Sequence, residues 1–210
     1  ADVDHFIALK EEVNDIKILD QSYRIPGGPI HELSQNIINK VQNRFDKQYK
    51  PREEQGLLKR YSDITQVNMS QGNWLVLSSA NYFLDDAKDL CEIQGWYYQY
   101  KGMNSVSLKL LLALNNWEHW RKGELLNHLE IKNIYEYLGS NVLVGFQKGK
   151  TLHSDGKYTL KECQEQHGLA TSAVWYESFE GLDPMTETYI RNMRANGEQI
   201  NKNPRIKMST

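Results

Sequence analysis

The segment from Leu19 to Pro26 places an aromatic side chain next to a guanidinium, at Tyr23 and Arg24. It follows a stretch at 15–20 in which isoleucines alternate with polar residues, as in a strand with one buried face. Proteins built from parallel strands and helices bind ligands at the carboxyl ends of the strands. Tyr23 stacked on a base and Arg24 forked onto a phosphate would form such a site. The structural alternative is that Tyr23 packs on the sheet and Arg24 pairs with a surface carboxylate.

Other common catalytic signatures are missing from this sequence. There is no Gly-x-x-x-x-Gly-Lys-Ser/Thr phosphate loop, and no Gly-x-Gly-x-x-Gly turn follows a strand. The pair Gly27 and Gly28 lies between two prolines and predicts a turn instead. The six histidines show no His-Glu-x-x-His spacing, and no Gly-x-Ser-x-Gly nucleophile turn occurs. We therefore expect neither a complete nucleotide cradle nor a metal site in this chain.

The elements that would position Tyr23 and Arg24 belong to an α/β pattern over residues 1–102. From Pro29 to Phe45, apolar residues recur every three or four positions, which predicts a helix of about four turns. A polar stretch at 48–56 predicts a loop.

A second strand is expected at Trp74 to Leu77, whose continuous apolar run is typical of an interior strand covered on both faces. Asn81 is placed to cap the helix that follows, with Phe83 on its inner side, and Gly95 is placed to end it. An aromatic strand at 96–100 then completes a parallel strand–helix–strand crossover.

After Gly102 the pattern becomes helical, with capping residues and glycines between the segments. The expected helices are approximately 105–121, 127–138, 159–167 and 183–196. The sequence therefore predicts an α/β layer over 1–102, a mainly helical insertion over 103–203, and a strand at 204–210 that returns to the sheet.

Composition is that of an ordinary globular protein. The chain has 210 residues, 40% of them hydrophobic and 25% charged, which excludes collagen, a coiled-coil rod and wholesale disorder. The net charge of -2 gives no global sign of a nucleic-acid binder, although a local groove can still be basic. Without a membrane-length apolar run or a signal-peptide pattern, the sequence predicts a cytoplasmic protein with no membrane partner. Cys91 and Cys163 have no Cys-x-x-Cys partner and are expected to be buried thiols.

The two ends of the sequence predict a piece of a longer protein. The chain opens on Ala1 without an initiator methionine and stops within the strand-like stretch 205–210.

Four short segments resemble, in order, parts of one enzyme family. Ala1-Asp2-Val3-Asp4 is similar to the tail of the Gly-Ala-Asp stretch after motif III, and Leu19 to Arg24 fits the Leu-x-x-x-Tyr-Arg core of motif IV. Leu75 to Asn81 resembles an apolar strand followed by Arg-Thr-Asn, with Ser79 where many relatives carry arginine. Pro204 to Thr210 looks like the approach to motif V. The family is the UvrD/Rep-type superfamily 1 DNA helicases, and the resemblance is to their second RecA-like domain (2A), truncated at motif V.

The resemblance implies a RecA-like (P-loop NTPase-type) parallel sheet interrupted by a 2B-like helical insertion. The insertion is shorter than in the large bacterial enzymes, which is more typical of a phage or environmental branch. ATP and Mg²⁺ would bind between this piece and a first RecA-like domain outside it, which would supply the phosphate loop. Arg24 would then act as a catalytic arginine finger on the γ-phosphate and Tyr23 would stack on adenine. The fragment alone is expected to bind no cofactor and to lack ATPase activity.

The resemblance also implies a track for single-stranded DNA, or for a single/double-strand junction. Thr210 is the first candidate contact, followed by Asn81 and Ser78, and the alternative role of each is a helix cap or a strand-end hydroxyl. The aromatic residues at 96–100, and likewise Trp117 and Trp120, are expected to form core packing rather than a base-stacking platform or a duplex wedge. The basic cluster between residues 40 and 52 is typical of a solvated helix face.

Two other functions remain open from the sequence. The chain is a non-catalytic binding module that keeps a degenerate RecA-like fold, or it is an unrelated α/β enzyme whose Tyr-Arg pair binds another phosphorylated ligand.

Overall fold

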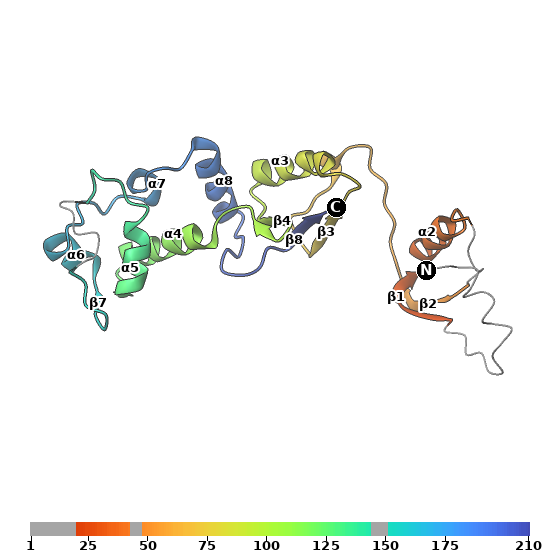
Figure 1. Cartoon of the computed structure of the whole chain (residues 1–210), viewed down its shortest axis with the longest axis horizontal. Helices are drawn as coiled ribbons and strands as arrows, with labels where there is room; N and C mark the ends of the chain where they lie inside the picture. Colours follow the sequence, from red (N-terminus) through yellow and green to blue (C-terminus); the bar gives the residue numbers. More distant parts are fainter. Residues whose placement is uncertain (1–19, 43–47, 144–150) are drawn as a thin grey trace. The chain divides into compact units, whose positions relative to one another are not determined.

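The computed structural model describes residues 20–42, 48–143 and 151–210, and the chain divides into two compact units, Ala1–Ser62 and Asp63–Thr210. This division falls inside the region that the sequence assigns to a single α/β layer. The sequence-based boundaries at 102 and 203 stay predictions. Each unit is described by itself (Figure 1).

The first unit contains a short strand–helix–strand arrangement. Strands β1 (Gln21–Gly27) and β2 (Lys50–Gln55) pair in parallel, and helix α2 (Pro29–Ile38) lies between them in sequence. The predicted turn at the glycine pair is present, because Gly27 ends β1 and Gly28 precedes α2 with a φ of 67°. Pro29 then begins the helix, where its missing N–H costs nothing.

Three expectations for this unit need correction or lie outside the described residues. The strand predicted at 15–20 falls almost entirely in the undescribed segment 1–19. The helix predicted to reach Phe45 ends at Ile38, and residues 43–47 are not described. The loop predicted at 48–56 is wrong, because Lys50–Gln55 forms β2 despite its charged sequence. The backbone pairing with β1 holds that strand in place, so side-chain hydrophobicity gives no sign of it.

The second unit is built on a four-stranded sheet in the order β3-β8-β4-β5. Strand β8 (Ile206–Ser209) is parallel to both of its neighbours, β3 (Trp74–Leu77) and β4 (Tyr98–Tyr100), whereas β5 (Met103–Asn104) is antiparallel to β4. Lys101 and Gly102 form the turn into β5, both with positive φ, as a tight hairpin requires.

The predicted parallel crossover is confirmed in outline. Short 3₁₀ helix η2 (Asn81–Leu84) and helix α3 (Asp85–Gln94) connect β3 to β4. Residues 206–209, predicted to return to the sheet, form β8 and insert between those two strands. The sheet that contains β8 does not contain β1, so the expectation of one sheet carrying both Arg24 and the terminal strand is not met by these strand pairings.

Helix α3 covers one face of the sheet (Figure 1). Ile206 and Met208 on β8 are buried on that side, where they join the core with Leu84 and Leu90. The prediction that Trp74–Leu77 is an interior strand covered on both faces is wrong. It is an edge strand, and Leu75 and Leu77 point to the opposite face and are exposed.

The helices predicted between β5 and β8 are present in the described residues, although each is shorter than predicted and a short sheet lies among them. The elements of this segment are α4 (Leu108–Arg121), β6 (Leu126–Asn127), α5 (His128–Tyr135), β7 (Lys157–Tyr158), α6 (Leu160–Gln166), α7 (Trp175–Ser178) and α8 (Pro184–Ala195), with β6 and β7 paired antiparallel. A further 3₁₀ turn, η1 (Ile64–Gln66), precedes β3. The capping residues predicted for α6 and α8 are confirmed. Thr159 forms a capping box with Glu162, and the Asp183 carboxylate accepts hydrogen bonds from the first turn of α8.

Most of the aromatic residues that the sequence predicts in the core are buried there, and Tyr100 is partly buried. Trp117 and Trp120 are fully buried with their rings 6.0 Å apart and nearly perpendicular. Each indole N–H is satisfied, donating to the carbonyls of Ala173 and Tyr158 respectively. Trp96, Tyr97 and Tyr98 are buried as well, so they are not free to stack on a ligand.

The structure is thus a mixed α/β protein with several small sheets, some of them parallel. None of the described helices combines the length and the apolar content of a membrane span.

Candidate functional site

Tyr23 and Arg24 lie within strand β1, not after the end of a strand as the sequence predicts. Gln21 pairs with Lys50 and Pro26 pairs with Arg52, so five steps along β1 correspond to two steps along β2. The residues between the paired positions therefore bulge out of the ladder.

The bulge has a local cause. The Ser22 hydroxyl oxygen accepts hydrogen bonds from the backbone N–H groups of Arg24 and Ile25, at 3.4 and 3.2 Å. Short hydroxyl side chains commonly form such bonds in competition with a sheet ladder. This arrangement exposes the two side chains that follow Ser22, because the backbone carrying them is lifted away from β2.

The structural alternative was that Tyr23 packs on the sheet and Arg24 pairs with a surface carboxylate. The described residues show neither contact. The Tyr23 side chain is 82% exposed, so it does not pack on a sheet. The Arg24 guanidinium forms no ion pair with any carboxylate in residues 20–42, 48–143 and 151–210. Nearby cations are paired, Lys50 with Asp20 at 2.9 Å and Arg52 with Glu54 at 2.8 Å. The Arg24 side chain is exposed, and a guanidinium is a planar fork that suits an anionic ligand.

Ser78 and Thr210 come together at the carboxyl edge of the main sheet. They follow the neighbouring parallel strands β3 and β8, and the Ser78 N–H donates to the Ser209 carbonyl at 3.2 Å. Because parallel strands end at the same edge, the sequence-predicted DNA contacts Ser78 and Thr210 share one surface.

Asn81 stands three residues beyond Ser78 at the start of η2 and is exposed. The alternative role as a helix cap is not observed, because Ala80 occupies the cap position of η2 and no side chain caps that turn. The Ser78 hydroxyl instead accepts a weak hydrogen bond of 3.5 Å from the Ala80 N–H. The Asn81 amide therefore faces solvent beside the carboxyl edge.

Tyr82 and Phe83 are functional candidates that the sequence reasoning missed. Their side chains are 66% and 56% exposed, and their ring centroids lie 4.1 Å apart. Phe83 was expected on the inner side of a helix, and that expectation is wrong because residues 81–84 form a tighter 3₁₀ turn before α3 begins at Asp85. The sequence did offer a signal, because two adjacent aromatic residues directly follow the polar run Ser-Ser-Ala-Asn at the end of a predicted strand.

The same edge carries mixed charge. Lys88 and Lys101 both approach the Tyr100 ring, with their ammonium nitrogens 4.5 and 5.4 Å from its centroid. Lys88 also pairs with Asp85 at 2.5 Å, and that hydrogen bond raises the pKa of the lysine. Lys101 has a positive φ at the end of β4, and its backbone N–H donates to the Met208 carbonyl. The edge thus combines cations, hydroxyls, an amide and two exposed rings.

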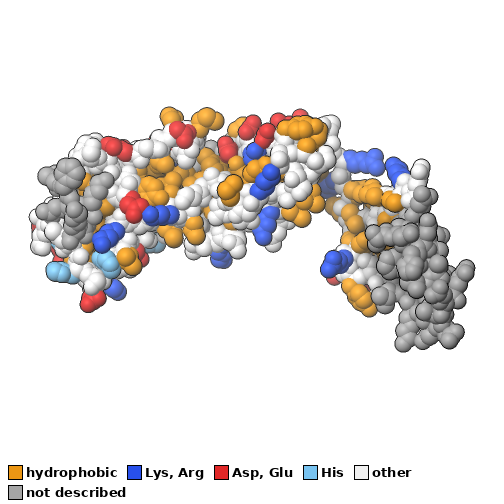
Figure 2. All heavy atoms as spheres, in the orientation of Figure 1, with side chains coloured by type: hydrophobic (Ala, Val, Ile, Leu, Met, Phe, Trp, Pro, Cys, Tyr) orange, Lys and Arg blue, Asp and Glu red, His pale blue; other side chains and the backbone are white. Residues whose placement is uncertain are grey.

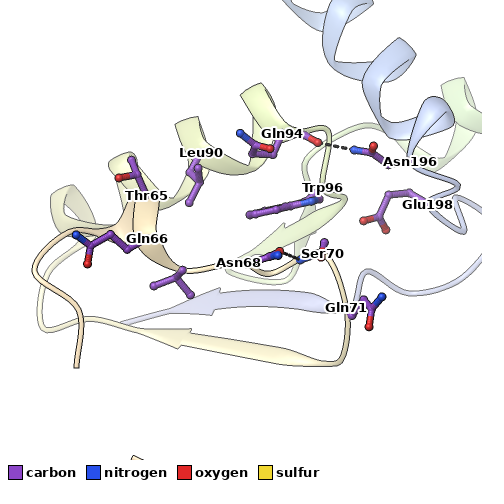
Figure 3. Close-up of a pocket in the computed structure, with 11 residues that line it drawn as sticks. Thr65, Gln66, Asn68, Ser70, Gln71, Leu90, Gln94, Trp96, Asn196 and Glu198 are labelled. Atoms are coloured by element: carbon purple, nitrogen blue, oxygen red, sulfur yellow. Dashed lines mark hydrogen bonds between the residues drawn. The ribbon is translucent and has the colours of Figure 1, made fainter. Parts of the chain in front are cut away.

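A polar pocket lies at the opposite, amino edge of the sheet (Figure 3). Its volume is about 580 Å³, and Trp96, Asn68 and Gln94 are among the side chains that line it. The Asn68 amide oxygen accepts from the Ser70 N–H at 2.9 Å, and Asn196 donates to the Gln94 carbonyl. These hydrogen bonds make the amides part of the local fold.

Glu198 is the one carboxylate among the residues that line this pocket. Its side chain is largely buried and pairs with Arg205 at 2.6 Å, and Arg205 also donates to the Met69 carbonyl. This carboxylate is therefore held by an ion pair within the pocket wall. The lining offers mainly polar groups for recognition.

The thiols are buried, as predicted, and burial raises the pKa of Cys91 to about 12 and that of Cys163 to about 11. Such thiols are poor nucleophiles. Among the described residues, no three histidine, cysteine or acidic side chains come together as a metal site would require. The expectation of no metal in this piece stays a prediction.

Comparison of the chain with protein-family models, with curated proteins and with solved structures gave no match. The helicase resemblance therefore rests on the four sequence segments alone.

Proposed function

We propose that the chain is part of an ATP-dependent DNA helicase or translocase with a RecA-like fold, in which it supplies an arginine finger and part of the track for single-stranded DNA. The observation that carries the proposal is the parallel pairing of β8 between β3 and β4, after a long helical segment. That order fits a RecA-like sheet interrupted by an insertion. It also brings two of the three predicted DNA contacts, Ser78 and Thr210, to one edge.

The exposed Arg24, which forms no ion pair with the described part of the chain, fits the role of an arginine finger. A guanidinium held on a bulged strand, outside any described ion pair, is free to reach the γ-phosphate of ATP bound on another domain. The exposed Tyr23 ring fits stacking on adenine. The described residues offer no carboxylate cluster for Mg²⁺, so its ligands would come from the first RecA-like domain. Charge that develops on the phosphate would be stabilised by Arg24 only when the two domains close, which couples hydrolysis to movement along DNA.

The carboxyl edge of the main sheet fits a strand of nucleic acid. Hydroxyls of Ser78 and Thr210 and the Asn81 amide would donate to phosphates, while Tyr82 and Phe83 would stack on bases. Binding of this kind needs no global positive charge, since stacking and neutral donors contribute alongside the lysines.

The test is Arg24→Ala in the intact protein. We expect DNA-stimulated ATP hydrolysis to fall by about 10³-fold or more, with single-strand affinity nearly unchanged. Arg24→Lys keeps the charge but loses the two-pronged geometry, and should restore little activity. The matched control is Arg52→Ala, which removes an exposed arginine that is already paired with Glu54. If Arg24→Ala hydrolysed ATP at the wild-type rate, Arg24 would not be an arginine finger.

The alternative function is a non-catalytic binding module with a degenerate RecA-like fold. One observation favours it, because β1 pairs with β2 and not with the strands of the main sheet. An intact protein that binds single-stranded DNA but hydrolyses no ATP would support the module. The isolated 210 residues are expected to be inactive in either case.

A further inference from the structure

Helices α3 and α8 enclose an apolar groove of about 670 Å³ on the surface of the second unit. Ile93 from α3 and Met185 from α8 line it and are 69% and 77% exposed. Pro184 and the ring of Tyr189 complete its apolar lining. Two large hydrophobic side chains therefore face solvent across one groove.

Hydrogen bonds fix α8 against α3 and the residues that follow it. The Asn192 amide donates to the Ile93 carbonyl at 3.2 Å, and the Tyr189 hydroxyl donates to the Trp96 carbonyl at 2.9 Å. Gly95 lets the helices approach closely, because a Cβ there would lie 2.5 Å from the Asn192 backbone. A preformed groove of this kind loses little conformational entropy when a ligand binds.

The charge around the groove is acidic. Asp89 and Glu92 line it, and none of the described lysines and arginines does. Glu92 is held in place by the Tyr98 hydroxyl, which donates to it at 2.7 Å. Lys88, the cation of α3, is already paired with Asp85, and Arg191 on α8 is paired with Glu187. Figure 2 shows acidic and hydrophobic side chains next to one another over α3 and α8.

We propose that this groove binds a basic amphipathic helix of a partner protein. Apolar side chains of the partner would fill the space between Ile93 and Met185, and its lysines or arginines would face Asp89 and Glu92. The lining on α8 runs from Pro184 to Asn192, which is about 12 Å of helix and matches about two turns of a bound helix. Charge complementarity selects a cationic partner over an acidic one. This interaction is independent of ATP and DNA.

The probe is a fluorescein-labelled 18-residue peptide of leucine and lysine with helical spacing, titrated with the whole chain and followed by fluorescence anisotropy. We expect saturable binding with a Kd on the order of micromolar. Ile93→Asp and Met185→Asp should each weaken it about tenfold or more, because each places a charge in the apolar lining. Asp89→Lys should weaken it and reduce its salt dependence. Leu75→Asp, on the exposed face of the sheet, is the matched control and should leave the affinity unchanged.

Four results would overturn the proposal. They are no saturable binding, equal binding of a leucine–glutamate peptide, equal affinity in the groove variants, and a wild-type dimer in light scattering that Met185→Asp dissociates. The last would make the groove an interface between two copies of the chain. Circular dichroism of each variant checks that the fold is retained. Hydrogen exchange provides a second measurement, and peptide-induced protection should be confined to α3 and α8.

Discussion

The backbone N–H of Ser78 donates to the carbonyl of Ser209 at 3.2 Å, which fixes the register in which β3 and β8 end. The pairing continues from Trp74 with Ile206 through to Leu77 with Ser209 without a bulge. A shift of one residue would exchange the buried and exposed faces of β8. The position of Thr210 beside Ser78 is therefore set by the hydrophobic pattern of the strand as much as by the hydrogen bond.

Loss of either exposed ring at the carboxyl edge should weaken binding of single-stranded DNA. Base stacking on an aromatic side chain contributes about 1–3 kcal/mol, so Tyr82→Ala and Phe83→Ala should each reduce affinity for oligo-dT by about fivefold or more. Fluorescence anisotropy at fixed salt measures this. Tyr176→Ala removes a partly exposed ring elsewhere in the same unit and should have no effect. Unchanged affinity in both edge variants would exclude the rings from the DNA track.

Gly95→Ala should strongly destabilise the second unit. Gly95 has a φ of 67°, and an added Cβ would lie 2.5 Å from the Asn192 backbone, so strain and overlap both oppose the change. We expect a loss of about 3–5 kcal/mol in the free energy of unfolding, measured with urea. Gly102→Ala is the control, because its φ is 81° but no atom lies within 4 Å. Gly102→Ala should lower the free energy of unfolding by only about 1–2 kcal/mol. Equal losses in the two variants would show that the close contact between α3 and α8 at Gly95 is not important.

Arg205→Met should leave the Glu198 carboxylate buried without its partner. The Glu198 side chain is 8% exposed and its ion pair with Arg205 measures 2.6 Å. Breaking a buried pair on one side costs about 3–5 kcal/mol. The double variant Arg205→Met/Glu198→Met should recover most of that loss, because no charge then remains unpaired. Urea unfolding of the wild type, Arg205→Met, Glu198→Met and the double variant gives the coupling energy between the two residues. Additive effects of the two substitutions would contradict a buried pair.

The Cys91 thiol should resist labelling in the folded protein. Burial raises its pKa to about 12, so almost no thiolate forms at pH 8. In the unfolded chain the thiol ionises near its ordinary pKa of about 8.5. The stabilisation from this group is therefore complete below that pH and is lost as the pH rises toward 12. Mass spectrometry should find Cys91 unlabelled by a disulfide reagent at pH 8 until urea is added, and rapid labelling without urea would disprove its burial.

Local patterns predicted the helical segment well. Capping residues such as Thr159 and Asp183, and the stop at Gly95, act through hydrogen bonds and φ angles within a few residues of themselves, so the sequence alone locates them. The strand at 206–209 was also predictable, because its apolar and polar residues alternate in the sequence, and the structure buries the apolar ones.

What the sequence did not predict depends on longer-range contacts. Lys50–Gln55 forms a strand only because β1 lies beside it, and its charged residues carry no strand signal. Leu75 and Leu77 suggested a strand covered on both faces, whereas the strand order places them at an edge. In the candidate site, Ser78 and Thr210 lie at one edge because the strands that precede them pair in parallel. The exposure of Phe83 did not, because the 3₁₀ turn changes the direction of its side chain.

The strand order also affects how the protein is made. Because β8 lies between β3 and β4, the centre of the sheet stays empty until residues 206–209 have left the ribosome. Throughout synthesis of the helical segment, two unpaired strand edges face each other and can bind the wrong strand. Closure of this sheet therefore waits for the synthesis of β8, and a chaperone that shields β3 and β4 until then would increase the yield.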